Sequence, residues 1–258
     1  MSEPLARPRW GFWASLGFWC HVALETALGR RLSRVLERRR AGRVLRATGS
    51  EHVPRAGNVV FCVNHYHAGL TLDVISATLL AADERRPRTS DACALVVGNR
   101  VRAGASWRSR VARGMAAWFF RRWEQNILRV RTHTSDAPAG IGELRTWRRR
   151  TREAPTLVFP EGAANGALGS MRPGVGRWLR GLGVPAVPVA VWWGGDRWNV
   201  AFGAPLVWSG RRDLLDLQLG LAMAELLPRE LAPTWSGVLE QWRAAHAAAP
   251  RLRASGDD

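Results

Sequence analysis

Short apolar runs and helical patterns alternate along the chain. Runs of strand length, several of them rich in β-branched residues, occur at 59–63, 92–98, 156–159 and 184–192, with shorter extended pieces at 43–48, 127–131 and 199–202. Segments with helical character lie between them, at 72–80, 100–122, 139–152, 173–182 and 214–227. Strands that alternate with helices predict an α/β fold, with a mixed, largely parallel central sheet flanked by helices.

The N-terminal residues form a different pattern. The run from Trp10 to Leu24 carries no formal charge and is shorter than the roughly 20 residues that span a bilayer. Apolar residues then continue at helical spacing with arginines between them, which predicts an N-terminal amphipathic helical region at a membrane interface. A core helix packed on a sheet would show the same apolar stripe. We divide the chain into an interfacial helical region at 1–42, an α/β domain at 43–230 and a C-terminal helix and tail at 231–258.

The net charge of the chain limits the kinds of molecule that it is expected to bind. The net charge is +17 and the chain contains no lysine, so arginine supplies the whole positive excess. The planar guanidinium binds phosphate in nucleic acid and in anionic lipid equally well. The arginines are spread over many segments and no recognised nucleic-acid motif appears, which favours a lipid surface. Three widely spaced cysteines form no disulfide or metal pattern and favour a reducing, cytosol-facing location (Cys20, Cys62 and Cys93).

Candidate chemistry is concentrated in residues 58–73. The apolar run at 59–63 ends in Asn64, His65, Tyr66 and His67, and a small-residue corner then leads to a helical run in which Thr71 is the expected N-cap. Asp73 falls in the first turn of that helix. A carboxylate beside an imidazole makes a general base, since the carboxylate fixes the tautomer and stabilises the imidazolium. The alternative from these residues alone is that the histidines are polar caps on a strand end.

Two further groups follow other predicted strands. Arg129 and Arg131 end the short strand at 127–131, and Phe159, Pro160, Glu161 and Gly162 follow the strand at 156–159. Sites in open α/β sheets form at the carboxyl ends of strands, so these groups are expected to converge with residues 64–73.

The ordered set of motifs resembles the glycerolipid acyltransferases of the lysophosphatidic acid acyltransferase type. Asn64-His65 followed by Asp73 matches the first family motif, Arg131 the second, and Phe159-Pro160-Glu161-Gly162 the third. The apolar, proline-containing strand at 184–191 matches the fourth. The resemblance covers about residues 43–230 with the motifs in the right order. It implies transfer of a fatty acyl chain from acyl-CoA or acyl carrier protein to a hydroxyl of glycerol phosphate, lysophosphatidate or another lysolipid, in phospholipid biosynthesis.

The resemblance also implies roles for individual residues. His65 takes the proton of the acceptor hydroxyl, and Asp73 orients the imidazole. Arg131, with Arg129 beside it, grips an acceptor phosphate. Glu161 orients an arginine such as Arg131 or Arg172, while the backbone N–H groups of Gly162 and Ala163 face the anion. The implied substrate-binding set is Asn64, Arg129, Arg131, Phe159, Pro160, Glu161, Gly162 and Arg172, with no bound cofactor, no metal and no covalent acyl-enzyme.

The chain departs from the family pattern at two places. The family usually has four residues between its histidine and aspartate, whereas seven separate His65 from Asp73 and five separate His67 from Asp73. The loop therefore bulges so that His65 keeps its partner, or His67 takes the role, or the site is degenerate; His65 is favoured because Asn64-His65 directly follows the strand. The second departure is at 163–165, Ala-Ala-Asn, where the family commonly has Thr-Arg-Ser, so one phosphate-binding arginine is missing and the acceptor head group stays open.

These inferences predict a peripheral (monotopic) membrane acyltransferase on the cytoplasmic face. Its partners would be a bilayer with anionic phospholipids, the lipid acceptor and an acyl-CoA or acyl carrier protein donor, with no nucleic acid. One alternative is a non-catalytic membrane-surface protein of the same fold. A basic nucleic-acid-binding protein is the other.

Overall fold

The computed structural model describes residues 8, 11–28, 32–40, 44–67, 70–96, 145, 148–162 and 166–244. The helix expected at 100–122 and the strand expected at 127–131, with Arg129 and Arg131, lie outside these residues. Within the helix expected at 139–152, residues 145 and 148–151 are helical.

A six-stranded sheet forms the centre of the described structure, with the strand order β1-β6-β5-β2-β4-β3. All neighbouring strands pair in parallel except β5 and β6, which are antiparallel. This confirms the predicted α/β fold with a mixed, largely parallel sheet. The strands are β1 (Val44–Thr48), β2 (Val60–Val63), β3 (Ala94–Val96), β4 (Thr156–Val158), β5 (Ala186–Gly194) and β6 (Arg197–Phe202).

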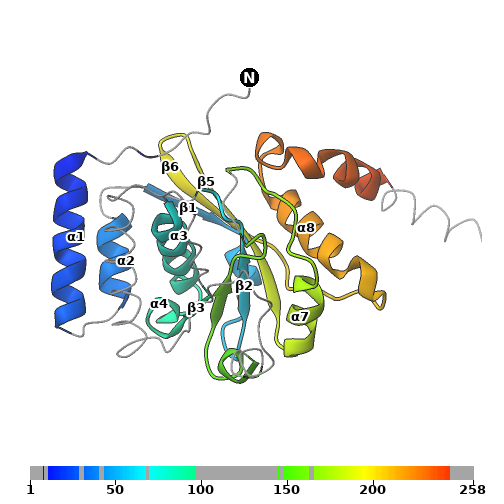
Figure 1. The fold of residues 1–258 in the computed structure, drawn as a ribbon, viewed down its shortest axis with the longest axis horizontal. Coiled ribbons are helices and arrows are strands. Elements are labelled where there is room, and N and C mark those ends of the chain that lie inside the picture. Colours follow the sequence, from blue (N-terminus) through cyan, green and yellow to red (C-terminus); the bar gives the residue numbers. More distant parts are fainter. Residues whose placement is uncertain are drawn as a thin grey trace, which may run out of the picture.

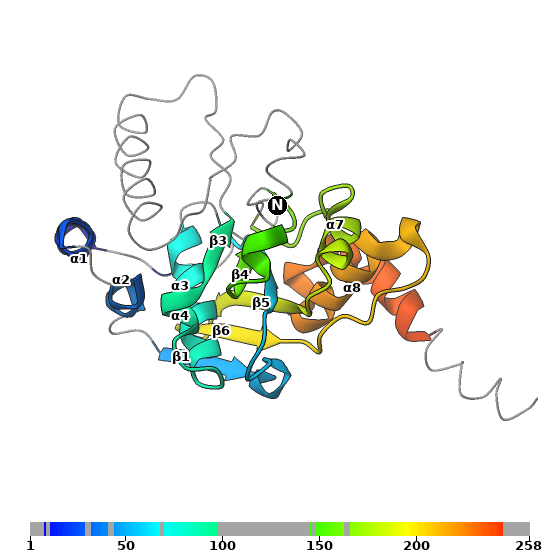
Figure 2. The same ribbon diagram turned by 90° about the horizontal axis from the view of Figure 1, so that it is seen from below.

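Helices flank the sheet in two groups. α1 to α4 gather on one side and α7 and α8 on the other, as both views show (Figures 1 and 2). α3 ends at Asp83, and residues 84–88 form turns and a bend before the short α4. The helices are α1 (Phe12–Ala27), α2 (Leu32–Arg40), α3 (Thr71–Asp83), α4 (Thr89–Ala92), α7 (Val175–Leu182) and α8 (Leu215–Leu226), and residues 236–244 are also helical.

One buried core runs through the described structure and crosses both boundaries drawn from the sequence. Phe18 and Val22 of α1 and Leu36 of α2 belong to the same apolar cluster as the strands, and so do Leu231 and Trp235 near the C-terminal end. Both flanking regions therefore pack on the α/β domain.

The outer face of α1 is apolar and exposed. Trp13 is 78% exposed, and Leu16, Trp19, Leu24 and Leu28 also present large apolar side chains to solvent. The opposite side of the helix, with Phe18 and Val22, is buried in the core. None of the helices in the described ranges is long and apolar enough to cross a membrane.

Candidate active site

The candidate site lies where β2 and β4 end, and Asn64 holds this edge of the sheet together. Its amide Nδ2 donates to the Val191 carbonyl of β5 at 3.0 Å, and the Val191 N–H donates to Asn64 Oδ1 at 2.6 Å. The side chain is buried, and both ends of its amide are used by the backbone of β5. Asn64 therefore fixes the point at which the chain leaves β2, and its expected contact with substrate stays a prediction.

His65 is held on three sides. Its backbone N–H donates to Glu161 Oε1 at 2.7 Å, its ring stacks on Phe159 with the centroids 4.6 Å apart, and its Nε2 lies 2.9 Å from Thr71 Oγ1. Nδ1 is buried and has no hydrogen-bond partner in the part of the chain that the structure describes. Burial lowers the pKa of the imidazole to about 4. His65 is therefore neutral at physiological pH, which is the form that accepts a proton.

Glu161, which follows β4, bonds the backbone of two other segments: His65 just past the end of β2 and the loop that contains Gly169. Its Oε1 accepts from the His65 N–H, and its Oε2 accepts from the Gly169 N–H at 2.7 Å. Burial raises the pKa of the carboxyl, and the two N–H groups oppose that shift. The carboxylate therefore fixes two backbone segments of the site, and its expected action on an arginine such as Arg131 or Arg172 stays a prediction. Trp235 supports the same loop, since its Nε1 donates to the Gly169 carbonyl at 3.0 Å.

Thr71 does not cap α3, contrary to the sequence-based expectation. The helix includes Thr71, Leu70 occupies the N-cap position, and no side chain there bonds the backbone. The Leu70 N–H donates to the His67 carbonyl at 2.9 Å, just before the helix begins. The Thr71 hydroxyl lies beside the imidazole. In the sequence, the signal for another residue at this place is the unusual spacing between His65 and Asp73.

Asp73 is buried in the first turn of α3, and Oδ2 accepts from Arg39 Nη2 of α2 at 2.6 Å. This ion pair was missed in the sequence. A signal for it exists, because Arg39 continues the stripe of Val35 and Leu36 at helical spacing, where a buried residue is expected. The pairing of Asp73 with His65 stays a prediction.

The turn after β4 uses backbone groups that were expected to face an anion. The Gly162 N–H donates to the Phe159 carbonyl at 3.1 Å, which closes the turn. Gly162 has a φ of 70°, and a Cβ built there would lie 2.7 Å from Cδ of Arg172, so this side chain packs against the turn. The Arg172 N–H donates to the Pro160 carbonyl at 2.9 Å. Ala163 lies outside the described residues.

The structure also describes His67 and a group of arginines that precede β4. His67 is partly buried and follows His65 in the loop. Four arginines at helical spacing before β4 line an open cavity of about 430 Å³ together with Glu153 (Arg145, Arg148, Arg149 and Arg152). These arginines lie on the segment that leads into the start of β4, whereas His65 and Glu161 lie past the ends of strands.

A neutral imidazole within hydrogen-bond distance of a hydroxyl is the arrangement required for general-base catalysis. The 2.9 Å between His65 Nε2 and Thr71 Oγ1 falls in the range over which a base takes a hydroxyl proton. A family model described as Acyltransferase matches residues 44–192, more than half of the 258 residues. The chain belongs to the acyltransferase family. In this acyltransferase, Asn64, His65, Asp73 and Glu161 all lie inside the matched segment.

The acyltransferase is also similar to a solved structure. The crystal structure of the 1-acyl-sn-glycerophosphate (LPA) acyltransferase PlsC from Thermotoga maritima matches with a TM-score of 0.46 and 14% sequence identity. The match covers 82% of this chain and 81% of that chain. No curated protein gives a significant match.

Proposed function

We propose that this acyltransferase moves a fatty acyl chain from acyl-CoA or acyl carrier protein to a hydroxyl of glycerol phosphate, lysophosphatidate or another lysolipid, in phospholipid biosynthesis. The observation that carries the proposal is the neutral His65 imidazole with a hydroxyl 2.9 Å from Nε2. The order of the sequence motifs supports a glycerolipid acceptor.

In the proposed reaction, the acceptor hydroxyl takes the place of the Thr71 hydroxyl beside His65 Nε2. The base removes its proton as the oxygen attacks the thioester carbonyl, and the tetrahedral intermediate collapses with loss of the thiolate. The imidazolium then returns the proton to the thiolate, so the products are an oxygen ester and a free thiol. Stacking on Phe159 and the Glu161 bond to the His65 backbone hold the ring in place for these steps.

The acceptor's anionic group is proposed to bind arginine. Arg131 and Arg129 are the residues that the second motif suggests, and Arg172 is a third, since its side chain lies against the Gly162 turn next to the site. A guanidinium bonds phosphate oxygens through parallel N–H groups, which suits this role.

We further propose that the protein acts as a peripheral (monotopic) protein on the cytoplasmic face of a membrane. The support is the exposed apolar face of α1, where Trp13, Leu16 and Trp19 lie, together with the net charge of +17. Trp favours the membrane–water boundary, and anionic lipid attracts each nearby arginine by about 1 kcal/mol.

The test is thioester consumption by purified protein. Acyl-CoA and acyl carrier protein donors are offered to glycerol 3-phosphate and a panel of lysophospholipids, with His65→Ala and His67→Ala assayed beside the parent. We expect His65→Ala to lose about 10²–10⁴-fold in turnover, the usual contribution of a positioned base. His67→Ala should retain activity.

Vesicle binding and thermal unfolding of the same proteins provide the controls. Loss of turnover only in His67→Ala would assign the base to His67. No turnover on any acceptor, with binding to anionic vesicles retained, would favour the non-catalytic membrane-surface protein. An affinity for RNA or DNA well above the affinity for anionic vesicles would favour a basic nucleic-acid-binding protein.

A further inference from the structure

Arg39 connects the N-terminal helices to the candidate site. It lies in the last turn of α2, and its side chain is about 10% exposed, whereas Arg34 and Arg38 of the same helix are exposed. Its Nη2 donates to Asp73 Oδ2 at 2.6 Å, and its guanidinium carbon lies 4.7 Å from the centre of the Phe18 ring of α1. One side chain thus contacts α1 and α3 from α2.

Stability alone gives a weak reason for this arrangement. Burying a guanidinium and a carboxylate requires both to lose water, and apolar residues of similar size often stabilise a core as well or better. The rest of the contact between α2 and α3 is ordinary packing around Leu36 and the bond from Ser76 Oγ to the Leu36 carbonyl. The charged pair therefore points to a role for the carboxylate.

We propose that Arg39 is a positioning residue for acyl transfer, which holds the carboxylate of Asp73 in the orientation needed for its action on His65. This inference rests on the proposed function. A carboxylate has two oxygens, so a guanidinium and an imidazole can share it. In this buried position the guanidinium offsets the charge of the carboxylate.

The inference makes α1 and α2 part of the catalytic machinery. Phe18, beneath the Arg39 guanidinium, is followed directly by Trp19 on the exposed face of α1. The contacts Phe18–Arg39 and Arg39–Asp73 form a continuous path from the face proposed to meet lipid to the predicted catalytic carboxylate. Deletion or displacement of these helices would then alter turnover as well as membrane binding.

The charges around the imidazole set the sign of the expected effect. Glu161 bonds the His65 backbone from the β4 side. Asp73, bonded to Arg39, lies in the first turn of α3, two residues after the Thr71 whose hydroxyl is 2.9 Å from His65 Nε2. Removing the guanidinium leaves the Asp73 carboxylate without its positive partner. The imidazolium form of His65 is then less disfavoured, so the pKa of His65 should rise in Arg39→Gln.

The experiment compares Arg39→Gln, Arg39→Lys, Asp73→Asn and the double variant Arg39→Gln/Asp73→Asn in the full chain. Arg39→Gln should lower kcat by about tenfold or more with KM nearly unchanged, and shift the acidic limb of the pH profile upward. Arg39→Lys should recover part of kcat, and the double variant should be no less active than Asp73→Asn. Arg211→Gln, which breaks an exposed arginine–aspartate pair, is the matched control and should leave kcat unchanged.

Two outcomes would overturn the proposal. One is a folded Arg39→Gln whose kcat and pH limb equal those of the parent. The other is a double variant in which the two single losses simply add, because independent residues give additive effects. Thermal unfolding of every variant separates misfolding from loss of positioning, and Arg39→Lys, which keeps the charge, provides the folded comparison if Arg39→Gln unfolds.

A second readout does not need turnover. If the parent protein transfers no acyl chain to any acceptor, the proposed function fails, and the pKa of the His65 imidazole measured by NMR then tests Arg39. A higher pKa in Arg39→Gln than in the parent, with a value closer to the parent's in Arg39→Lys, supports the coupling of Arg39 to His65 through Asp73. An unchanged pKa in a folded Arg39→Gln rejects it.

Discussion

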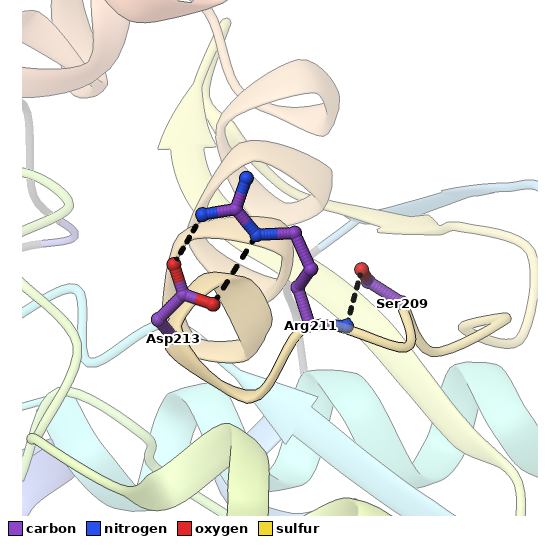
Figure 3. Close-up of polar contacts among 3 residues, drawn as sticks. All are labelled: Ser209, Arg211 and Asp213. Atoms are coloured by element: carbon purple, nitrogen blue, oxygen red, sulfur yellow. Dashed lines mark hydrogen bonds and ion pairs between the residues drawn. The ribbon is translucent and has the colours of Figure 1, made fainter.

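Two arginine–aspartate pairs in this protein have similar bond distances but different surroundings. Arg39 bonds Asp73 at 2.6 Å inside the molecule, and Arg211 bonds Asp213 at 2.7 Å on its surface. Figure 3 shows the surface pair, in which the Arg211 guanidinium faces both carboxylate oxygens and its backbone N–H donates to Ser209 Oγ at 3.1 Å. In the buried pair the side chains are 10% and 1% exposed, against 72% and 62% for the surface pair.

The difference shows that burial decides what such a contact does. Water competes for every group of the surface pair, so the loss of either partner is made good by solvent. The groups at the ends of β2 and β4 have no such replacement, and removing one leaves another unsatisfied. The buried edge of the sheet should therefore respond strongly to single substitutions that the surface at 209–213 tolerates.

Glu161→Gln should produce the largest structural effect of these changes. The glutamine amide keeps the shape but replaces one acceptor oxygen by an N–H₂ donor, which then faces the N–H of His65 or Gly169. We expect a loss of about 1–3 kcal/mol in the free energy of unfolding, the cost of an unsatisfied buried group. Urea denaturation measures it. Glu153→Gln on the surface is the control, and equal effects of the two would contradict the assignment.

The pH dependence of the free energy of unfolding tests the effect of burial on His65. Its pKa of about 4 in the folded protein lies below the usual 6.5, so between these values the unfolded chain binds the proton and the folded one does not. The contribution of His65 to stability is therefore retained above about 6.5 and lost as the pH falls toward 4. Unfolding free energies of the parent and His65→Gln across this range should diverge in that sense. A constant difference would show that the imidazole titrates alike in both states.

The same pKa predicts the activity profile. Since the base must be neutral, kcat/KM should stay level well below pH 6.5 and fall only as the pH approaches 4. A pH–rate profile measured where the protein remains folded tests this. A midpoint near 6.5 would indicate an exposed imidazole in the working enzyme.

Thr71→Val should have a smaller effect on turnover. Valine keeps the branched shape and removes the hydroxyl beside His65 Nε2, where the acceptor hydroxyl is proposed to bind. If Thr71 only orients the ring, kcat should fall by about threefold to tenfold, equivalent to one ordinary hydrogen bond. Steady-state kinetics measures it, with Thr71→Ser as the variant that restores the hydroxyl. A loss as large as that of His65→Ala would give Thr71 a direct part in the chemistry.

Arg211→Gln should have the smallest effect. Arg211 and Asp213 are exposed, and hydrogen bonding to Arg211 lowers the pKa of the Asp213 carboxyl without tying it to the core. We expect the midpoint of thermal unfolding and kcat to equal those of the parent. A clear drop in either would show that this surface supports the site.

Much of the site could be predicted because it follows from strand ends. The apolar runs before His65 and before Pro160 are read directly from the sequence, and parallel strands bring their carboxyl ends to one edge. Hence the proximity of Phe159 and Glu161 to His65 was expected, and the structure brings them together. The partners of Glu161 were not, since they are backbone N–H groups, which every residue except proline carries and no sequence pattern marks.

Arg39 and Thr71 are two residues whose contacts could not be predicted from the sequence. Arg39 lies 34 residues before Asp73, and only the packing of α2 on α3 brings the two together. The sequence predicts Thr71 as a helix cap, whereas in the structure Leu70 occupies the N-cap position and the Thr71 hydroxyl lies against the imidazole. Local preferences describe a residue's neighbours in sequence, whereas these contacts depend on how the segments meet.

The sequence by itself determined the order of strands and helices, the positive charge and the residues that carry the chemistry. These properties follow from periodicity and side-chain type, which are local. The tertiary structure decided which nitrogen of His65 meets a hydroxyl, which backbone groups Glu161 holds and which cation neutralises Asp73. Those outcomes depend on burial and on distances of about 3 Å between segments far apart in the chain, because only there does the loss of water make each partner matter.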